Sequence, residues 1–349
     1  MFKKVGLILL TMSGQALANQ DICLEKTFTV SNVILFEDII KQSAHCNSQQ
    51  TIRLKPGHYS IYNTIQIKRN NLTIQSLSNN PNSVTIAGDS MSPDAKIGNV
   101  FRISGKNIKI SGLTIEKSGY HLIQIAGESG AQSPIIENNI FRDSYQQMIK
   151  VTFGKDLTDR VKNGIVRNNH FEYSAGIGPN WYIGGIDAHG MINWQVTHNY
   201  FRNIASPKQQ VAEHAIHIWN QSADNLVANN TIINCDRGIG FGMGKRGNAG
   251  GKISKNNIYH KDNHHPYSDV GISIESSPGT LIENNLIILE HGYPSAIEYR
   301  FAQTTDVKIK DNRSNKPIQK RNSAKARLTN NQLLTQQESE ELILKNFNQ

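Results

Sequence analysis

The chain has 349 residues, with 37 lysines and arginines against 28 aspartates and glutamates, which gives a formal net charge of +9. After the first few residues, no segment is long and apolar enough to span a bilayer as a helix, so membrane insertion is not expected. The length would allow two domains, but the repetition described below predicts one elongated domain.

The first residues have the features of a secretory signal peptide. Lys3 and Lys4 precede a short apolar stretch, and the segment ends in Ala16-Leu17-Ala18, an A-x-A pattern. We expect residues 1–18 to be removed, so that the mature chain begins at Asn19 in the periplasm or outside the cell. A buried N-terminal helix is the alternative interpretation.

The remaining charge indicates the kind of partner. Removing the two lysines of the signal peptide changes the net charge from +9 to +7. A basic exported protein is expected to bind an acidic polysaccharide rather than nucleic acid. The alternative is that the surface lysines only keep the protein soluble. We predict a monomer.

Residues 19–49 are predicted to form an N-terminal cap. Cys23 and Cys46 lie in this segment and could close a disulfide, although a pair of free thiols stays open. Cys235 has no evident partner and is expected to pack as a small apolar residue.

A helix is predicted between the two cysteines. Residues 33–44 have apolar side chains at helical spacing, at Ile34, Leu35, Ile39 and Ile40. A stack of β-coils exposes its apolar end, so we expect this helix to cover that end.

A repeat follows, marked by asparagines. Taking the second residue of each Asn pair, or its equivalent, gives Asn139, Asn169, Asn199, Asn230, Asn257, Asn285 and Asn312. The markers are 27 to 31 residues apart, and apolar and polar residues alternate on both sides of each, which is the period of a strand. The pattern predicts an all-β fold, a single-stranded right-handed parallel β-helix of roughly nine to ten coils over residues 50–315. The asparagines are expected to stack as a ladder along one corner.

The two ends of the repeat differ in character. Pro56-Gly57-His58-Tyr59 opens the first coil after the predicted capping helix. In this arrangement the chain resembles the pectate-lyase-like superfamily of β-helix proteins, which implies the architecture more than an activity. Residues 316–349 lose the repeat and are predicted to be a C-terminal cap or a flexible tail. Helical spacing within residues 332–347 supports the cap.

One strand of each repeat carries outward residues that form two columns. Each strand has a central isoleucine that faces the core, so the next residue faces outward. The first column is Gln124, Lys150, Asp187, His217, Gly240, Ser273 and Glu298. The second column, two residues further on, is Ala126, Thr152, His189, Trp219, Gly242, Glu275 and Arg300. Parallel strands stack about 4.8 Å apart, so neighbours in a column are expected to be in contact.

Chemically active residues are concentrated in two consecutive repeats. These repeats carry Asp187, His189, Glu213, His214, His217, Trp219, Asp236 and Arg237. The long loops before three of the strands, within residues 169–186, 199–216 and 257–272, are expected to wall this face into a groove. Glycines 238, 240 and 242 are expected to leave space on its floor for a ligand.

Several of these residues have simpler interpretations. His214 lies just before its strand and could fix the loop instead of binding substrate. Arg237 follows Asp236, and a structural ion pair is the alternative to a substrate role. Trp219 could be a platform for a sugar ring or a surface aromatic.

No metal or cofactor site is predicted. The loop of residues 260–269 contains three histidines and two aspartates, but their spacing matches no ligand signature, so a solvated loop is expected. Residues 240–251 form a glycine-rich turn and not a phosphate-binding loop. A divalent cation such as calcium stays open as an aid to substrate binding.

The segment around Asp187 suggests a reaction. Asp187-Ala188-His189-Gly190 resembles the signature of mannuronan C5-epimerases, Asp-Pro-His followed by an acidic residue, at its first and third positions only. The motifs of β-helix polygalacturonases are absent, although Glu275 and Glu298 keep hydrolysis by two carboxylates open.

Polyuronate lyases and C5-epimerases both begin by removing the C5 proton of a uronic acid. This step needs a base at C5 and a positive group at the carboxylate. We predict a lyase, with a C5-epimerase as the alternative. His189 and His217 are the candidate base and acid, Asp187 the orienting group, and Arg237 and Arg300 the carboxylate neutralisers.

Other residues are assigned to substrate binding. The candidates are His214, Trp219, Glu275, Glu298 and Lys150. A β-helix that binds surface glycan without reaction, or an adhesin-like scaffold, is the alternative from another class. The concentration of the cluster in a few repeats favours an enzyme.

Overall fold

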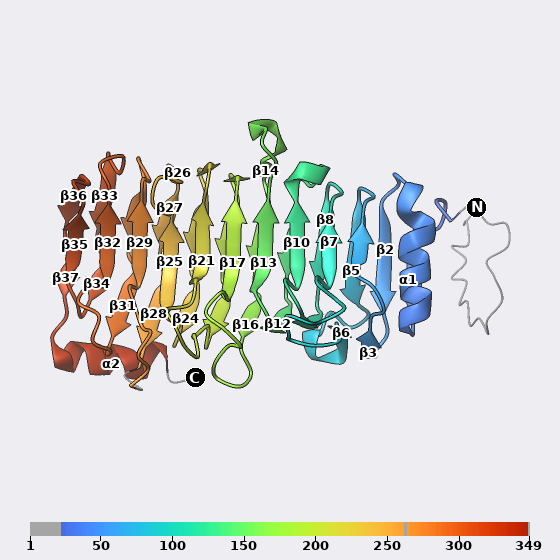
Figure 1. Cartoon of the computed structure of the whole chain (residues 1–349), viewed down its shortest axis with the longest axis horizontal. Helices are drawn as coiled ribbons and strands as arrows, with labels where there is room; N and C mark the ends of the chain where they lie inside the picture. The colour runs from blue at the N-terminus through green and yellow to red at the C-terminus, as the bar shows by residue number, and fades with distance from the viewer. Residues whose placement is uncertain (1–21, 262–263, 348–349) are drawn as a thin grey trace, which may run out of the picture.

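The computed structural model describes residues 22–261 and 264–347. Over this range the chain is a right-handed parallel β-helix of about 11 turns, slightly longer than the nine to ten coils predicted. The coils stack into an elongated solenoid, with α1 (Val33–Gln42) at its N-terminal end and α2 (Gln336–Asn346) beside its last coils (Figure 1). Within the described residues no helix is long and apolar enough to cross a membrane. The predicted signal peptide lies outside these residues.

Each coil contributes one strand to each of three parallel sheets. Sheet A is formed by β1 (Thr27–Val30), β2 (Gln50–Leu54), β5 (Leu72–Ser76), β8 (Ile108–Ser111), β11 (Ile135–Glu137), β15 (Ile165–Arg167), β19 (Gln195–Thr197), β23 (Leu226–Ala228), β27 (Lys252–Ser254), β30 (Leu281–Glu283), β33 (Val307–Lys310) and β36 (Ala326–Thr329). Sheet B is formed by β3 (Gly57–Ser60), β6 (Val84–Ala87), β9 (Thr114–Ser118), β12 (Ile140–Ser144), β16 (His170–Glu172), β20 (Tyr200–Arg202), β24 (Thr231–Ile233), β28 (Asn257–His260), β31 (Leu286–Leu289), β34 (Arg313–Ser314) and β37 (Gln332–Leu333).

Sheet C carries the predicted outward columns. It is formed by β4 (Ile65–Ile67), β7 (Phe101–Ile103), β10 (Ile123–Ala126), β13 (Gln147–Thr152), β17 (Gly184–His189), β21 (His214–Trp219), β25 (Arg237–Phe241), β29 (Ile272–Glu275), β32 (Ile297–Arg300) and β35 (Ile318–Arg321). Four middle coils add a short fourth sheet directly after sheet C. Its strands are β14 (Val161–Lys162), β18 (Met191–Ile192), β22 (Ser222–Ala223) and β26 (Asn248–Ala249).

The β-helix is longer at both ends than the predicted range of 50–315. β1 precedes the capping helix and pairs with β2, and β35, β36 and β37 add a further coil where a cap or tail was predicted. This last coil is short and lacks the apolar alternation of the other coils. Its strands are therefore largely exposed. The β-helix therefore extends one coil beyond the last coil whose repeat can be recognised in the sequence.

An asparagine ladder runs along the corner between sheets A and B, as predicted. Its members are Asn139, Asn169, Asn199, Asn230, Asn256, Asn285, Asn312 and Asn331. In each pair of neighbours the Nδ2 group donates to the Oδ1 atom of the next asparagine at 2.9–3.1 Å. The same Oδ1 also accepts the backbone N–H of the preceding ladder residue, for example from Asn169 to Asn199 at 3.0 Å. The ladder thus satisfies buried backbone donors at every turn.

One predicted ladder position is wrong by a residue. Asn256 occupies the ladder, whereas the predicted Asn257 is the first residue of β28. The residue before each ladder asparagine has a left-handed backbone, and in this coil that residue is Lys255, with φ 56°. Because the asparagine pair at 256–257 is shifted by one place relative to the other coils, its second member was not the marker.

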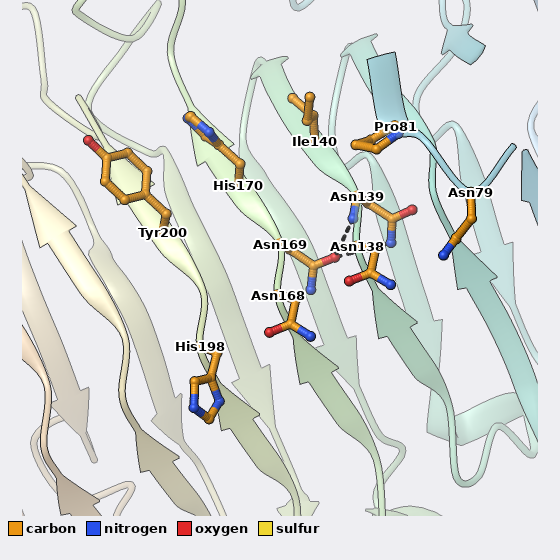
Figure 2. Close-up of a pocket in the computed structure, with 10 residues that line it drawn as sticks. All are labelled: Asn79, Pro81, Asn138, Asn139, Ile140, Asn168, Asn169, His170, His198 and Tyr200. Atoms are coloured by element: carbon orange, nitrogen blue, oxygen red, sulfur yellow. Dashed lines mark hydrogen bonds between the residues drawn. The ribbon is translucent and has the colours of Figure 1, made fainter. Parts of the chain in front are cut away.

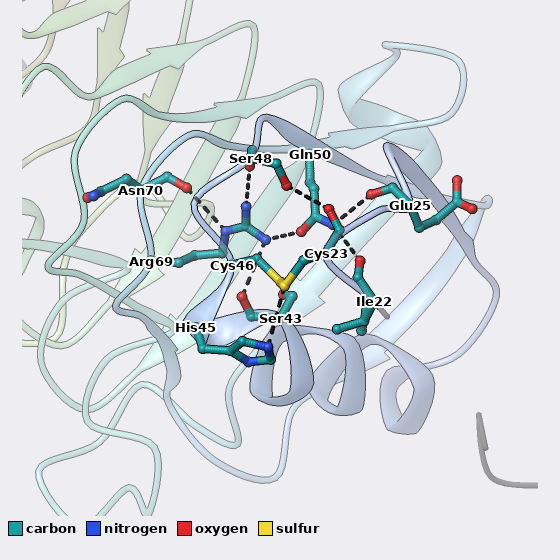
Figure 3. Close-up of a disulfide and its surroundings, with 10 residues drawn as sticks. All are labelled: Ile22, Cys23, Glu25, Ser43, His45, Cys46, Ser48, Gln50, Arg69 and Asn70. Carbon is teal, nitrogen blue, oxygen red and sulfur yellow. Dashed lines mark hydrogen bonds between the residues drawn. A yellow bond between two sulfur atoms is a disulfide. The ribbon is translucent and has the colours of Figure 1, made fainter. Parts of the chain in front are cut away.

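The N-terminal cap is held together by the Cys23–Cys46 disulfide (Figure 3), which the sequence had left open. Helix α1 begins after Asn32, whose Oδ1 accepts from the backbone N–H of Leu35 at 2.9 Å. It buries Phe36, Ile39 and Ile40, while Ile34, one of the residues at the predicted helical spacing, is exposed.

A buried arginine ties the cap to the first coils. Arg69 is 4% exposed, and its guanidinium donates to the carbonyl oxygens of Ser48 at 2.5 Å and Asn70 at 3.1 Å, and to the side chain of Gln50 (Figure 3). Burial lowers the pKa of this guanidinium from its ordinary value. The cap and the first coil of the β-helix are therefore one packed unit.

The C-terminal helix has a capping box between Thr335 and Glu338. It covers outward apolar residues of the last coils, because Leu334 and Phe347 form a small apolar cluster with Leu286 and Ile288 of β31. Cys235 is free and buried, as predicted.

The interior is filled by stacked apolar side chains. Phe141, Phe171 and Phe201, one per coil, stack with ring centroids 4.8 Å and 4.5 Å apart. All three are fully buried. This packing fixes the coils directly behind the strands that carry the predicted site.

The ladder register can be tested with two adjacent substitutions. Asn256→Ala removes the acceptor of the Asn230 backbone N–H and the donor to the carbonyl of Val227, so several buried polar groups lose partners. At about 1–3 kcal/mol for each such group, the free energy of unfolding should fall by at least ~3 kcal/mol. Asn257→Ala should change it by less than about 1 kcal/mol. Thermal melting followed by circular dichroism measures both, and equal losses would contradict the observed register.

Candidate active site on sheet C

The predicted outward columns are confirmed by the strand register. Lys150 lies opposite Asp187, and Asp187 lies opposite His217, on adjacent strands β13, β17 and β21. In the second column His189 lies opposite Trp219. Residues 30 to 37 positions apart in sequence are thereby brought into one layer of side chains.

Asp187 is the centre of this layer. It is 3% exposed, forms an ion pair with Lys150, and accepts the indole N–H of Trp219 at 2.6 Å. Burial alone would raise the pKa of Asp187, but the positive charge of Lys150, the largest opposing effect, helps to outweigh it, so the pKa is lowered. Asp187 is therefore an ionised carboxylate that holds Lys150 and Trp219 in place.

His189 is the accessible imidazole of the cluster. Its side chain is 20% exposed, and its ring lies edge-on to Trp219 with centroids 4.3 Å apart. Its Nε2 atom is 3.4 Å from Lys150 Nζ, and its Nδ1 atom is 3.3 Å from Asn220 Nδ2. Burial, and next the charge of Lys150, lower the pKa of His189 to about 4. The imidazole is therefore neutral at pH 7 and able to take up a proton.

His217 belongs to the same cluster but is covered. It faces outward from the sheet as predicted, yet it is 1% exposed because the indole of Trp219 stacks on it at a centroid distance of 5.1 Å. Its Nε2 is 3.2 Å from the carbonyl oxygen of Gly242. A buried histidine under a tryptophan does not contact a polymer on the surface, so this geometry does not support the predicted acid or base role.

The glycines of β25 make room for protein atoms and not for a ligand. A Cβ atom at Gly240 would lie 2.7 Å from Nε2 of His214, whose ring occupies the space above this glycine. His214 in turn contacts Ser273 Oγ at 2.9 Å. A Cβ atom at Gly238 would lie 2.1 Å from the carbonyl oxygen of Gly271. The expected ligand space on the floor is therefore filled.

Three predicted site residues lie far from His189. Arg300 is four strands away along the second column, roughly 19 Å at about 4.8 Å per strand. It is paired with Glu275 at 2.8 Å. Glu298 is buried and accepts from Tyr293, Ser295 and Arg321. These groups form a separate structural network.

Arg237 takes the structural alternative that the sequence left open. It pairs with Asp269, Nε to Oδ2 at 3.0 Å, and not with the adjacent Asp236. Asp236 is buried and accepts the backbone N–H groups of Ser206 and Ala212, which fixes the loop before β21.

Arg246 is a further residue of the site, and nothing in the sequence pattern had pointed to it. The glycine-rich turn folds back on itself between Met243 and Arg246 and places the Arg246 guanidinium 4.1 Å from the ring centroid of Trp219. Arg246 is exposed, and within the described residues it has no carboxylate at ion-pair distance. It is thus a cation at the site that is not neutralised by a salt bridge. Composition alone showed only a turn, because the contact depends on the direction in which the turn folds.

The departures from the Asp-Pro-His-acid signature have a packing cause. Gly190 has a left-handed φ of 60°, and a Cβ atom there would lie 2.6 Å from the ring of Phe153. An acidic residue does not fit at this position. Ala188 points into the core and is fully buried.

A shallow hollow lies elsewhere, along the asparagine corner (Figure 2). It is lined by Asn79, Pro81, Asn138, Asn139, Ile140, Asn168, Asn169, His170, His198 and Tyr200. Its shape follows from the turns between sheets A and B, and its asparagine amides are largely occupied by the ladder. The titratable side chains are instead concentrated on sheet C, around Asp187 and His189. We take this cluster as the candidate site.

No protein-family model matches the sequence, and no curated protein matches it. Among solved structures, an alginate lyase from Paenibacillus sp. str. FPU-7 is similar, with a TM-score of 0.60 and 14% identity over 87% of this chain and 98% of that one. A mannuronic acid specific family 6 polysaccharide lyase from human gut microbiota has a TM-score of 0.55 and 14% identity over 90% and 84%. An endo-xylogalacturonan hydrolase from Aspergillus tubingensis has a TM-score of 0.53 and 11% identity over 84% and 91%.

These similarities define the class of fold. The chain is a right-handed parallel β-helix, as the resemblance to the pectate-lyase-like superfamily implied. At 11–14% identity the shared architecture is what the comparisons establish.

The partly buried His121 makes the fold sensitive to acid. Burial lowers the pKa of His121 to about 4, although its Nδ1 atom lies 2.9 Å from the carbonyl oxygen of Gln147. Because the unfolded state takes up this proton near pH 6.5 and the folded state near pH 4, stability is present above pH 6.5 and is lost as the pH falls toward 4. His121→Gln should flatten the loss between pH 6 and 4.5 by about 1 kcal/mol per pH unit. His198→Asn, an exposed turn position, is the control; identical pH profiles of melting for the two variants would contradict the assignment.

Proposed function

We propose that this protein acts on a polyuronate by removing the proton at C5, with His189 as the base, and that the reaction is β-elimination. The observation that carries the proposal is a neutral, partly exposed imidazole held beside a buried Lys150–Asp187 ion pair on an open sheet face. Enzymes that abstract weakly acidic protons need such a group, with its proton-accepting form populated at the working pH.

The similar structures support a polysaccharide substrate. Two of them are named as lyases, one for alginate and one specific for mannuronic acid. Their low identity carries only the fold, so the residues of this chain must support the reaction. The net charge of +9 for the full chain, or +7 without Lys3 and Lys4 of the expected signal peptide, agrees with an acidic polymer.

Lys150 links substrate binding to activation of the base. Its ammonium lies between Asp187 and Nε2 of His189. A substrate carboxylate that binds the ammonium would draw it away from the imidazole and leave the Nε2 lone pair free for the C5 proton. Asp187 stays ionised and positions both Lys150 and Trp219.

Arg246 is the proposed neutraliser of the substrate carboxylate. It replaces Arg237 and Arg300 in this role because both of these are engaged in ion pairs. Negative charge develops on the carboxylate when the C5 proton leaves, and an unpaired guanidinium beside the base stabilises it. Trp219 would place a sugar ring between Arg246 and His189.

Elimination is favoured over epimerisation by the number of accessible groups. An epimerase needs a second proton donor on the opposite face of the sugar ring, and His217, the candidate for this role, is buried. A single imidazole can take the C5 proton and return it to the leaving C4 oxygen when both lie on the same face of the ring. This arrangement is found in uronates of the manno and gluco configuration, which are therefore the preferred substrates.

Hydrolysis by two carboxylates is not supported by the residues proposed for it. Glu275 accepts from Arg300 and from the backbone N–H of Gly244, and Glu298 is 1% exposed. Neither carboxyl group is free to flank a glycosidic bond.

Export of the mature chain remains part of the proposal. The Cys23–Cys46 disulfide supports it, because such bonds persist in oxidising compartments. A polyuronate substrate is also expected outside the cytoplasm.

The reaction is tested by incubating the protein with polymannuronate, polyguluronate, polygalacturonate and polyglucuronate. Unsaturated uronate absorbance is expected with polymannuronate or polyglucuronate. Deuterium at C5 in deuterated water without this absorbance would mean epimerisation, and new reducing ends without either signal would mean hydrolysis. Binding without turnover on the whole panel would favour a glycan-binding scaffold.

His189→Gln should lower kcat/KM by about 100-fold to 10,000-fold, because it removes the base and keeps the side-chain size. In the unaltered protein kcat/KM should hold from pH 7 to pH 5 and fall toward pH 4, where His189 takes up a proton. His198→Asn, on the opposite corner, should keep full activity. An unchanged rate in His189→Gln would exclude this residue as the base.

Arg246→Ala should lower kcat/KM for a polyuronate by roughly 10-fold to 100-fold, the loss of one charge-assisted hydrogen bond of about 1.5–3 kcal/mol. Lys245→Ala is the matched control, because Lys245 is an exposed cation in the same turn. If both variants lose the same activity, the general positive charge of the turn matters and not the position of Arg246 over Trp219.

A further inference from the structure

Three buried polar atoms without hydrogen-bond partners come from one short segment, Glu213-His214-Ala215-Ile216-His217. They are Oε2 of Glu213, Nδ1 of His214 and Nδ1 of His217. Each of these three residues offers a ligand atom within 4.8 Å of those of the other two. Buried polar atoms are normally paired, so three such atoms from one short segment need an explanation.

The other nitrogen of each imidazole is already engaged. His217 Nε2 lies 3.2 Å from the carbonyl oxygen of Gly242, which only accepts, so this nitrogen carries the proton. His214 Nε2 lies 2.9 Å from Ser273 Oγ. Ser273 Oγ can accept a proton from His214 Nε2, and when Nε2–H is the donor in both neutral rings, both Nδ1 atoms present lone pairs. Histidines that bind metals are held in this way, by a hydrogen bond from the second ring nitrogen.

The contact between His217 and Glu213 calls for a positive charge between the two side chains, which either a proton on Nδ1 or a metal ion supplies. Nδ1 of His217 lies 3.3 Å from Oε2 of Glu213, which is an ion-pair distance when the imidazole carries a second proton. The same nitrogen is 3.9 Å from Oδ1 of Asp187. When the ring carries a proton only on Nε2, a lone pair and two carboxylate oxygens meet in a region shielded from water, where their repulsion is strong unless a cation lies between them.

We propose that Glu213, His214 and His217 form a binding site for a divalent transition-metal ion of the zinc class. Two imidazole nitrogens and one carboxylate oxygen suit Zn²⁺ and its neighbours, whereas Ca²⁺ and Mg²⁺ prefer oxygen ligands only. Bond lengths of about 2.0–2.2 Å around a tetrahedral ion place ligand atoms roughly 3.4 Å apart. The Glu213–His217 separation of 3.3 Å already meets this requirement.

The site differs from the places where the sequence suggested ligands. In the loop of residues 260–269, the side chain of His265 bonds to Asp236 at 2.9 Å. The second group of potential ligands among the described residues, Cys23, His45 and Cys46, is closed by the disulfide. The proposed site lies behind Trp219, which stacks on His217, so a bound ion would fix the platform beside His189. It does not depend on the proposed reaction.

Metal content and binding test this proposal directly. The mature chain, prepared without a histidine tag and stripped with a chelator, is titrated with Zn²⁺ and with Co²⁺. One equivalent per chain is expected, with visible d–d absorption of Co²⁺ typical of low coordination number and a raised melting temperature in Zn²⁺. Less than a tenth of an equivalent, or Co²⁺ spectra identical to the free ion, would overturn the site.

Two variants assign the ligands. Glu213→Gln keeps the side-chain shape and should weaken Zn²⁺ binding by more than about 100-fold, since loss of an outer-shell partner alone costs 10-fold to 100-fold. His214→Gln should do the same. His170→Gln, a half-buried histidine of sheet B, should bind as the unaltered chain does. Far-UV circular dichroism confirms folding of each variant, and full-strength binding by a folded Glu213→Gln would overturn the assignment.

Discussion

The in-register stacking of parallel strands is the constraint on which the rest of this structure depends. Each coil places its residues directly above those of the coil before, at about 4.8 Å, so any chemical cluster must be assembled vertically. Lys150, Asp187 and His217 meet because they occupy the same position in consecutive strands of sheet C. The asparagine ladder fixes this register at the opposite corner, because each Oδ1 takes a backbone N–H from the coil below.

The stack separates two kinds of packing. Inside, phenylalanine rings at 4.5–4.8 Å fill the space between coils with apolar atoms. Outside, on sheet C, the same spacing brings together one carboxylate, one ammonium and several imidazoles, most of them buried. Such groups are costly to bury unless they are paired, and the Lys150–Asp187 pair with the indole N–H of Trp219 meets that condition. Burial lowers the pKa values of His189 and His214 and so favours their neutral forms.

The resulting site is a compact layer and not a wide groove. Trp219 covers His217, His214 fills the space over Gly240, and the arginine–carboxylate pairs of the later coils are remote. The accessible groups are consequently few: His189 and Arg246 are on either side of Trp219. A small set of exposed groups over a rigid support is the arrangement expected of a site that holds a polymer by a few sugar units.

The sequence alone determined the fold, the two outward columns and the membership of Asp187, His189 and Trp219 in one layer. It could do so because the strand period and the coil repeat are local patterns that fix both face and register. It assigned one ladder position to Asn257 instead of Asn256. The two asparagines are adjacent, and the sequence pattern alone does not show which of them occupies the corner. Only the tertiary structure decided that His217 is covered, that Arg246 reaches Trp219 and that Arg237 pairs with Asp269. These outcomes depend on the paths of loops and on side chains that pack between coils. Neither follows a periodic pattern, so neither can be predicted from the repeat in the sequence.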